Sequence, residues 1–247
     1  MTHGTHDWAF PPRPSMMGRM GAVLGVDISS GAWAGVLLDA GKVRSLIADD
    51  IASLVGAAAA DHPLCAVAID IPIDPPTQQV RRCDEVARAV LKGRGSTLFT
   101  APCLQALRAP DFPAALQINR QVLGRGLSQQ AYRLAAKILD VHGWLADGPS
   151  VPAFECHPEL SFAVLADPRS PTPVRYRKTS WEGARRRTQL LAGAGIAVAE
   201  LHDPTGRIGC DDMLDAAVAA WTARRFRDGQ ARRFPADAAA GEPVIWA

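Results

Sequence analysis

The stretch "AVLGVDISSGAWAGVLLDAGKVRSL", residues 22–46, decides the fold. It starts a pattern of three short apolar strands, separated by the turns Ser-Ser-Gly and Asp-Ala-Gly-Lys and expected at 22–29, 34–39 and 43–48. Such tight turns leave no room for a crossover helix, so neighbouring strands are predicted to run antiparallel. Asp27 is set into the end of the first strand. Because a buried ionised carboxylate is costly without a compensating positive charge, Asp27 marks a candidate site.

The elements that follow alternate between helix and strand. "DDIASLVGAAAADHP" has apolar residues at helical spacing behind an Asp cap and ends at Pro63. "LCAVAIDIPID" at 64–74 is a continuous apolar run, typical of a central parallel strand covered on both faces. A fifth strand is expected before Pro158, and the tail "AGEPVIWA" is a candidate edge strand. The fifth strand is predicted at 151–156. Later helices are predicted at 128–145, from about 181 and from about 211.

Length and composition bound the number of domains, and the order of the elements favours one. The chain has 247 residues with 48% hydrophobic content, enough for one sizeable core or two small ones. We expect a single α/β domain over 21–247 with a helical insertion at about 75–127, preceded by a flexible arm at 1–20. The formal net charge of +2 permits an anionic partner without requiring one.

Location is indicated by what the chain lacks. No apolar run approaches the roughly 18–20 residues of a membrane span, and the start has no signal-peptide pattern, so we expect no membrane partner. The five cysteines are scattered and never form a C-x-x-C pair, which argues against a disulfide framework or a zinc knuckle. A cytoplasmic location is the corresponding expectation. The sequence does not indicate an oligomeric state.

Acidic residues also stand at the ends of the later strands. Asp70 ends the fourth strand just before Pro72, so a parallel pairing with the first strand would bring Asp27 and Asp70 together. Glu155 closes the fifth strand, and His157 shares its face because strand side chains repeat every two residues. The structural alternatives are turn capping by Asp27, a solvated strand end at Asp70, and a bond between Glu155 and His157.

The last helix adds further acids. Asp212 and Asp215 are three residues apart and share a face, while Asp211 is the best candidate for the helix cap. A purely structural role for Asp212 and Asp215 would be to offset the helix dipole. Several acids converging at one sheet edge would repel one another strongly unless a cation bound there. Mg²⁺ or Mn²⁺ suits such a site, since two ions about 3.5–4 Å apart can support phosphodiester cleavage by water.

The ordered set of motifs resembles a known family. These motifs are "GVD", "IDIPID", "RRCDEVARAV", "GSTLFTAP", "FECHPELSF", "RKTSWEGARRR" and "DDMLDAAVAA", spread over residues 22–225. The set is similar to the family called domain of unknown function 429, described as predicted nucleases. The last motif also resembles the closing motif of RuvC-type resolvases. The resemblance implies an α/β, RNase H-like fold: a five-stranded mixed sheet, with a three-strand antiparallel meander and two parallel strands, flanked by helices.

The resemblance also implies roles for the acids. It makes Asp27, Asp70 and Asp215 metal ligands, with Asp212 beside them as a further catalytic acid. Glu155 would be a ligand or a water-positioning base. RNase H proper carries a glutamate on its first helix, whereas this chain offers only aspartates near the corresponding helix, which leaves the number of bound metal ions open. These aspartates are Asp49, Asp50 and Asp61.

Two basic segments are candidates for substrate contact. "KGRGSTLF" contains Arg94 between two glycines, and "RYRKTSWEGARRR" contains Lys178 and Arg185. Positive charge there would suit a phosphate backbone, although an ordinary loop and a solvated helix face are the structural alternatives. Trp181 could stack on a base or pack at the core or its rim.

Together these features predict a metal-dependent nuclease, a hydrolase that attacks a phosphodiester with water. Its partner would be a nucleic acid of unspecified type. The alternative is a non-catalytic RNase H-like module that binds nucleic acid or protein, with vestigial acids. A kinase of the actin-like class would share the first-strand aspartate, but the chain has no second meander or glycine-rich adenosine motif.

Overall fold

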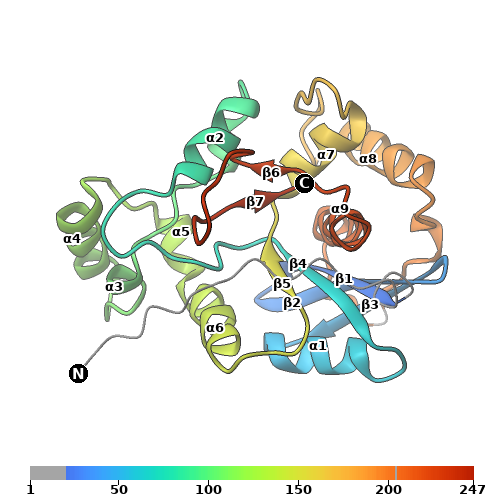
Figure 1. The fold of residues 1–247 in the computed structure, drawn as a ribbon, viewed down its shortest axis with the longest axis horizontal. Coiled ribbons are helices and arrows are strands. Elements are labelled where there is room, and N and C mark those ends of the chain that lie inside the picture. The colour runs from blue at the N-terminus through green and yellow to red at the C-terminus, as the bar shows by residue number, and fades with distance from the viewer. Residues whose placement is uncertain (1–20, 204) are drawn as a thin grey trace.

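A mixed sheet of five strands forms the centre of the chain, in the order β3-β2-β1-β4-β5 (Figure 1). β1 runs antiparallel to β2, and β2 to β3, whereas β4 is parallel to both β1 and β5. The predicted three-strand meander with two parallel strands is therefore confirmed. The strands are β1 (Ala22–Ser29), β2 (Ala32–Asp39), β3 (Lys42–Ala48), β4 (Leu64–Ile69) and β5 (Ala153–Glu155).

The computed structural model describes residues 21–203 and 205–247, so the arm expected at 1–20 lies outside the described residues. All five cysteines lie in the described part, and none forms a disulfide there. None of the helices in these residues is both long and apolar enough to cross a lipid bilayer.

Two tight turns set the register of the meander. Ser30 and Gly31 both have positive φ, as do Ala40 and Gly41, with values of 48°, 79°, 46° and 85°. Two consecutive residues of this kind make the turn whose twist matches antiparallel strands. Glycine at the second position of each turn has no side chain, so it adopts positive φ without the strain that another residue would add there. The turn chemistry therefore closes both hairpins locally, without help from the rest of the chain.

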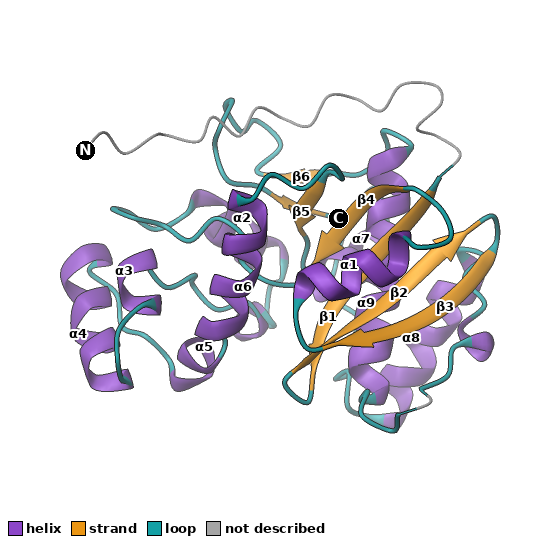
Figure 2. Cartoon of the chain, turned by 90° about the horizontal axis from the view of Figure 1, so that it is seen from below, coloured by secondary structure: helices purple, strands orange, loops and turns teal. Residues whose placement is uncertain are grey.

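Helices cover both faces of the sheet (Figures 1 and 2). Strand side chains alternate between the two layers: Val23 packs into one apolar cluster and Leu24 into the other. The first layer contains α7 (Pro158–Ala166), α8 (Trp181–Gly193) and α9 (Cys210–Arg227), and the second contains α1 (Ile51–Ala59) and α6 (Ala135–Ala146). Burial on both faces explains why β4 has no polar alternation.

The segment between β4 and α6 is mostly helical and includes a third apolar cluster. Figures 1 and 2 place α3 and α4 to one side of the sheet. Cys103, Ala106 and Ala115 form part of this separate cluster. The elements are α2 (Arg82–Val90), the short 3-10 helix η2 (Gly95–Thr97), α3 (Leu104–Leu107), α4 (Phe112–Leu123) and α5 (Gln129–Arg133).

Three expectations about helices need correction. The single helix expected at 128–145 is broken, because the Leu134 amide bonds to Ala131 in a tighter turn. Pro158 does not merely end a strand; it occupies the first turn of α7, where its missing N–H costs nothing. Asp211 is not the cap of α9: Gly209 is, and its amide donates to Ser29 Oγ at 2.9 Å.

The tail also pairs differently from the simplest expectation. Its last strand, β7 (Ile245–Trp246), joins β6 (Arg233–Phe234) in a separate antiparallel pair. A single bridge between Cys156 and Trp246 connects this pair to the chain just after β5. The tail therefore covers the end of the main sheet instead of extending it as a regular edge strand.

Candidate active site

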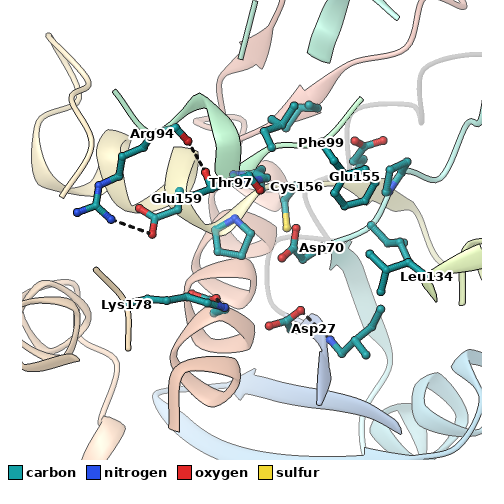
Figure 3. A pocket seen from close by; sticks show the side chains of 18 of the residues that line it. Asp27, Asp70, Arg94, Thr97, Phe99, Leu134, Glu155, Cys156, Glu159 and Lys178 are labelled. Atoms are coloured by element: carbon teal, nitrogen blue, oxygen red, sulfur yellow. Dashed lines mark hydrogen bonds and ion pairs between the residues drawn. The ribbon is translucent and has the colours of Figure 1, made fainter. Parts of the chain in front are cut away.

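A cavity of about 860 Å³ opens at the edge where β1, β4 and β5 end, and the acids of these strands line it (Figure 3). Val26 pairs with Ile69, and Asp27 and Asp70 are the next residues on their chains. The Asp70 amide donates to the Val26 carbonyl at 2.9 Å, which holds the two strand ends together. The predicted meeting of Asp27 and Asp70 thus follows from the parallel register.

The last helix brings two more acids to this cavity. α9 lies directly on β1: an added Cβ at Gly25 would stand 1.9 Å from the Ala220 amide nitrogen. This close approach places Asp215 over the end of β1, and Asp212 lines the same cavity. All five predicted acids therefore line one cavity, although they come from segments scattered over the whole chain.

Burial and mutual repulsion raise the pKa values of the central acids. The pKa of Asp27 lies well above its ordinary range, first because the carboxyl is buried and then because Asp70 and Asp215 are nearby. The pKa of Asp70 is raised in the same way, by burial and then by Asp215. Burial also raises the pKa of Asp215, to about 6. Ionising these carboxyl groups together is therefore unfavourable in this cavity unless a further positive charge enters it.

Lys178 is the cation at the centre of this group. Its Nζ lies 2.7 Å from Asp215 Oδ2, 3.3 Å from Asp211 Oδ2 and 3.9 Å from Asp212 Oδ1. Burial lowers the pKa of Lys178, but Asp215 and its neighbours outweigh burial and raise it overall. In residues 21–203 and 205–247, no three Asp, Glu, His or Cys side chains are gathered closely enough to hold a metal ion. Lys178 thus supplies positive charge to the three acids of α9.

Glu155 is engaged by a residue that sequence reasoning missed. Arg81 donates to both carboxylate oxygens of Glu155, at 2.6 and 2.8 Å, and to Asp84 at 2.5 Å. The Ile73 amide donates to Glu155 at 3.2 Å, and the Ala101 amide donates to Asp84 at 3.0 Å. The network therefore ties the loop after β4, the first turn of α2, the loop at Ala101 and the end of β5 together, and Glu155 has few lone pairs left for a ligand.

The alternative bond between Glu155 and His157 is wrong. His157 instead places Nε2 3.4 Å from the Thr97 carbonyl, and its Nδ1 has no hydrogen-bond partner among the described residues. Burial lowers the pKa of His157 to about 4, so the imidazole is neutral at pH 7. The signal for Arg81 was weak: only the i, i+3 spacing to Asp84 could have suggested a pair.

The predicted substrate contacts divide into two groups. Arg94 and Lys178 line the cavity, together with Arg175 and Arg177. Arg185 is placed elsewhere: on the exposed surface of α8 it forms an ion pair with Glu182 at 2.7 Å. Helix periodicity explains the difference, since Arg185 points away from the side of α8 that faces the core.

The raised pKa of Asp27 predicts a pH-dependent gain from Asp27→Asn in the metal-free protein. When the pKa of an acid is higher in the folded protein than its unfolded value of about 3.9, the folded protein binds more protons than the unfolded chain between these two pKa values. The protein therefore loses stability as the pH rises through that interval. We therefore expect the variant to melt higher than wild type at pH 8, and the difference to shrink toward pH 4. Thermal unfolding in EDTA across this range measures it.

Asp50→Asn is the matched control, because Asp50 caps α1 and its pKa is lowered by hydrogen bonds to Ser53. Asparagine caps a helix about as well as aspartate, so this variant should show no gain at pH 8. A gain from Asp27→Asn that is the same at every pH would contradict burial of an ionised carboxylate at this position.

The comparison with protein families gives one match. The family model described as Protein of unknown function (DUF429) matches residues 25–240. No curated protein and no solved structure matches. The matched range contains all five predicted acids that line the cavity, as well as Arg81 and Lys178. The chain belongs to the DUF429 family of proteins of unknown function.

Proposed function

We propose that this protein is a metal-dependent nuclease that hydrolyses phosphodiester bonds by water attack, with Asp27, Asp70 and Asp215 as its metal ligands. The observation that carries the proposal is the convergence of these acids in one cavity, where burial and their mutual repulsion raise the pKa values of Asp27 and Asp70. Folding stability alone does not favour this arrangement, because burying several unpaired acids together is costly. Such a cost is typical of a functional site.

The topology supports the same proposal. The order β3-β2-β1-β4-β5, with an antiparallel meander and two parallel strands, is the order of an RNase H-like sheet. Its acids stand on the first strand, directly after the fourth strand and on the last long helix, as that fold would require. We therefore propose an RNase H-like fold for this chain.

The chemistry of the donors suits a hard divalent cation, although three of them would have to move closer together than they lie in residues 21–203 and 205–247. Every candidate ligand is a carboxylate oxygen, the ligand type that Mg²⁺ and Mn²⁺ prefer. When bound, such an ion would activate a water molecule and stabilise the developing charge on a phosphodiester. Asp215 is paired with Lys178 at 2.7 Å, so ion binding competes with this ion pair. The charge on Lys178 then becomes available to a phosphate at the same edge of the cavity.

Other residues would bind and position the substrate. Arg94, Arg175 and Arg177 add positive charge to the lining of the cavity. The ion pair between Arg81 and Glu155 would hold the ends of β4 and β5 in register with the acids. In this proposal Glu155 is a positioning residue, and the three aspartates are the ligands.

The ion pair between Lys178 and Asp215 favours a second candidate function. It already neutralises one acid, as it would in a non-catalytic module that uses only its basic surface. Such a module would bind nucleic acid without cutting it. The two candidates therefore differ in one measurable step, cleavage.

Mn²⁺ titration and cleavage assays test the proposal. We expect wild type to give binding heat and a higher Tm with Mn²⁺, and Asp27→Asn to give neither. Labelled single- and double-stranded DNA and RNA should be cleaved with Mn²⁺ and left intact in EDTA or with Asp27→Asn. Asp50→Asn, the exposed cap of α1, should behave as wild type. Absence of Asp27-dependent heat would end the metal-site proposal, and binding without cleavage would support the module.

A further inference from the structure

Two large aromatic side chains are exposed in the described part of the chain, and both lie in one short segment. Trp181 is 80% exposed and Tyr176 is 41% exposed. The structural alternative for Trp181, packing at the core or its rim, is therefore wrong. The face of this indole is open to solvent, so it is available to stack on a ligand.

Basic residues are interleaved with these aromatic residues. Arg175, Arg177 and Lys178 line the cavity that contains the acids. Thr179 lines it too, two residues before Trp181. The guanidinium of Arg175 lies 5.5 Å from the ring centroid of Tyr176. Residues 175–181, which we call the basic-aromatic segment, thus lead along the chain from the cavity edge to the exposed indole.

The backbone of this segment is held from inside the protein. The Arg175 carbonyl accepts from Arg94 Nη2 at 2.7 Å, and the Tyr176 carbonyl accepts from Arg187 Nη1 at 3.2 Å. Arg187 is fully buried and forms an ion pair with Glu159 at 2.5 Å. The side chains of Arg175 and Tyr176 are exposed, whereas their carbonyls are bonded inward. The segment therefore presents its rings and charges from a fixed backbone.

Gly183 fixes the segment against α8. An added Cβ at this position would stand 1.8 Å from the Arg177 carbonyl oxygen, so only glycine permits this approach. Ser180 caps the helix by accepting from the Gly183 amide at 3.1 Å, and Trp181 is the first residue of α8. The indole is thus placed by a capped helix end, and ordering it on a ligand costs little backbone entropy.

A single nucleic-acid strand is the ligand that this chemistry suits. Unstacked bases bind exposed aromatic rings through their faces, and arginine or lysine contacts the backbone phosphates. The bases of a duplex are stacked on one another and cannot cover an indole on a protein surface. The segment carries two aromatic rings and three basic residues within seven positions, so it offers both kinds of contact to one strand.

We infer that the basic-aromatic segment is a binding platform for single-stranded nucleic acid, on which Trp181 and Tyr176 stack against bases while Arg175 and Arg177 contact phosphates. The inference rests on the proposed nuclease function in one respect, that the strand would continue into the cavity of the aspartates. The platform itself needs no metal ion, because its contacts are aromatic and basic.

Binding of labelled 12-nucleotide strands in EDTA tests the platform without cleavage. Fluorescence anisotropy should show that Trp181→Ala weakens binding of single-stranded DNA or RNA by about 5- to 150-fold. Trp181→Phe should recover most of this loss, since a smaller ring still stacks. The control is Arg44→Ala. Arg44 is an exposed residue of β3 that forms an ion pair with Asp61, and this variant should bind as wild type. Separate DNA and RNA strands show which nucleic acid is preferred.

The outcomes separate the platform from the catalytic proposal. Equal affinity of wild type and Trp181→Ala, tighter binding of a duplex than of a single strand, or no binding at all would overturn the platform. Trp181-dependent binding of single strands supports it, even when Mn²⁺ produces no cleavage. In that last case the platform stands and the nuclease proposal fails.

Discussion

Arg81→Leu is expected to lower the free energy of unfolding by about 3–5 kcal/mol, because it leaves buried carboxylates without their cation. The side chains of Arg81, Glu155 and Asp84 are 3%, 8% and 1% exposed, so water cannot replace the lost guanidinium. Burial raises the pKa of Glu155, and the charge of Arg81 opposes that shift. Without Arg81, the Glu155 carboxylate should therefore bind a proton more readily. Urea unfolding at pH 8 and at pH 5 measures both effects, and the loss should be smaller at pH 5.

Arg82→Leu is the matched control, one residue along the chain. Its guanidinium pairs with Asp237 and Glu242 but is 45% exposed. Exposed pairs of this kind contribute about 1 kcal/mol or less, so this variant should unfold almost like wild type. If Arg81→Leu cost no more than Arg82→Leu, the network would not hold the cavity wall, and Glu155 would regain its place as a candidate ligand.

Gly25→Ala is expected to cost about 3 kcal/mol of stability and to weaken Mn²⁺ binding. The new methyl group would lie 1.9 Å from the Ala220 nitrogen and 2.2 Å from the Ala216 oxygen. Both are backbone atoms of α9, so no side chain can rotate away and the helix itself must move. Moving α9 separates Asp215 from Asp27, which joins the stability loss to the site. Urea unfolding and Mn²⁺ calorimetry on the same preparation measure the two consequences.

Gly56→Ala gives the opposite expectation for the same chemical change. Gly56 lies inside α1, and an added Cβ there meets nothing within 4 Å. Alanine is the better helix former, so this variant should gain up to about 1 kcal/mol. A Gly25→Ala protein as stable as Gly56→Ala would show that α9 can move away from β1 at little cost.

The elements that sequence predicted well are those with local causes. Turns that need positive φ and strands of continuous apolar residues set the meander and β4, and these depend on neighbouring residues only. The family match over 25–240 agrees with the ordered motifs. By contrast, α7 was missed because it is buried on nearly all sides, so its sequence shows no polar face and no helical period.

The buried ion pairs show the limit of sequence reasoning. Arg81 and Glu155 are 74 residues apart, and Arg187 and Glu159 are 28 apart. The local pattern gives only weak signals, the i, i+3 spacing of Arg81 to Asp84 and the helical spacing of Arg187 with buried Gly183 and Leu191, and neither indicates the distant partner. Which basic residue is buried depends on where a distant carboxylate lies, and that is decided when the chain packs.

The sequence by itself determined the order and direction of the strands and the placement of Asp27 and Asp70 at one sheet edge, because parallel register carries strand ends to the same side. Tertiary structure alone decided that Lys178 lies among the acids, that Glu155 is held by Arg81, and that Trp181 stays exposed. The physical reason is that strands and their order can be expected from local apolar runs and tight turns, and a parallel pairing of β1 with β4 then brings their ends together, whereas burial and charge pairing depend on which side chains meet in the folded chain.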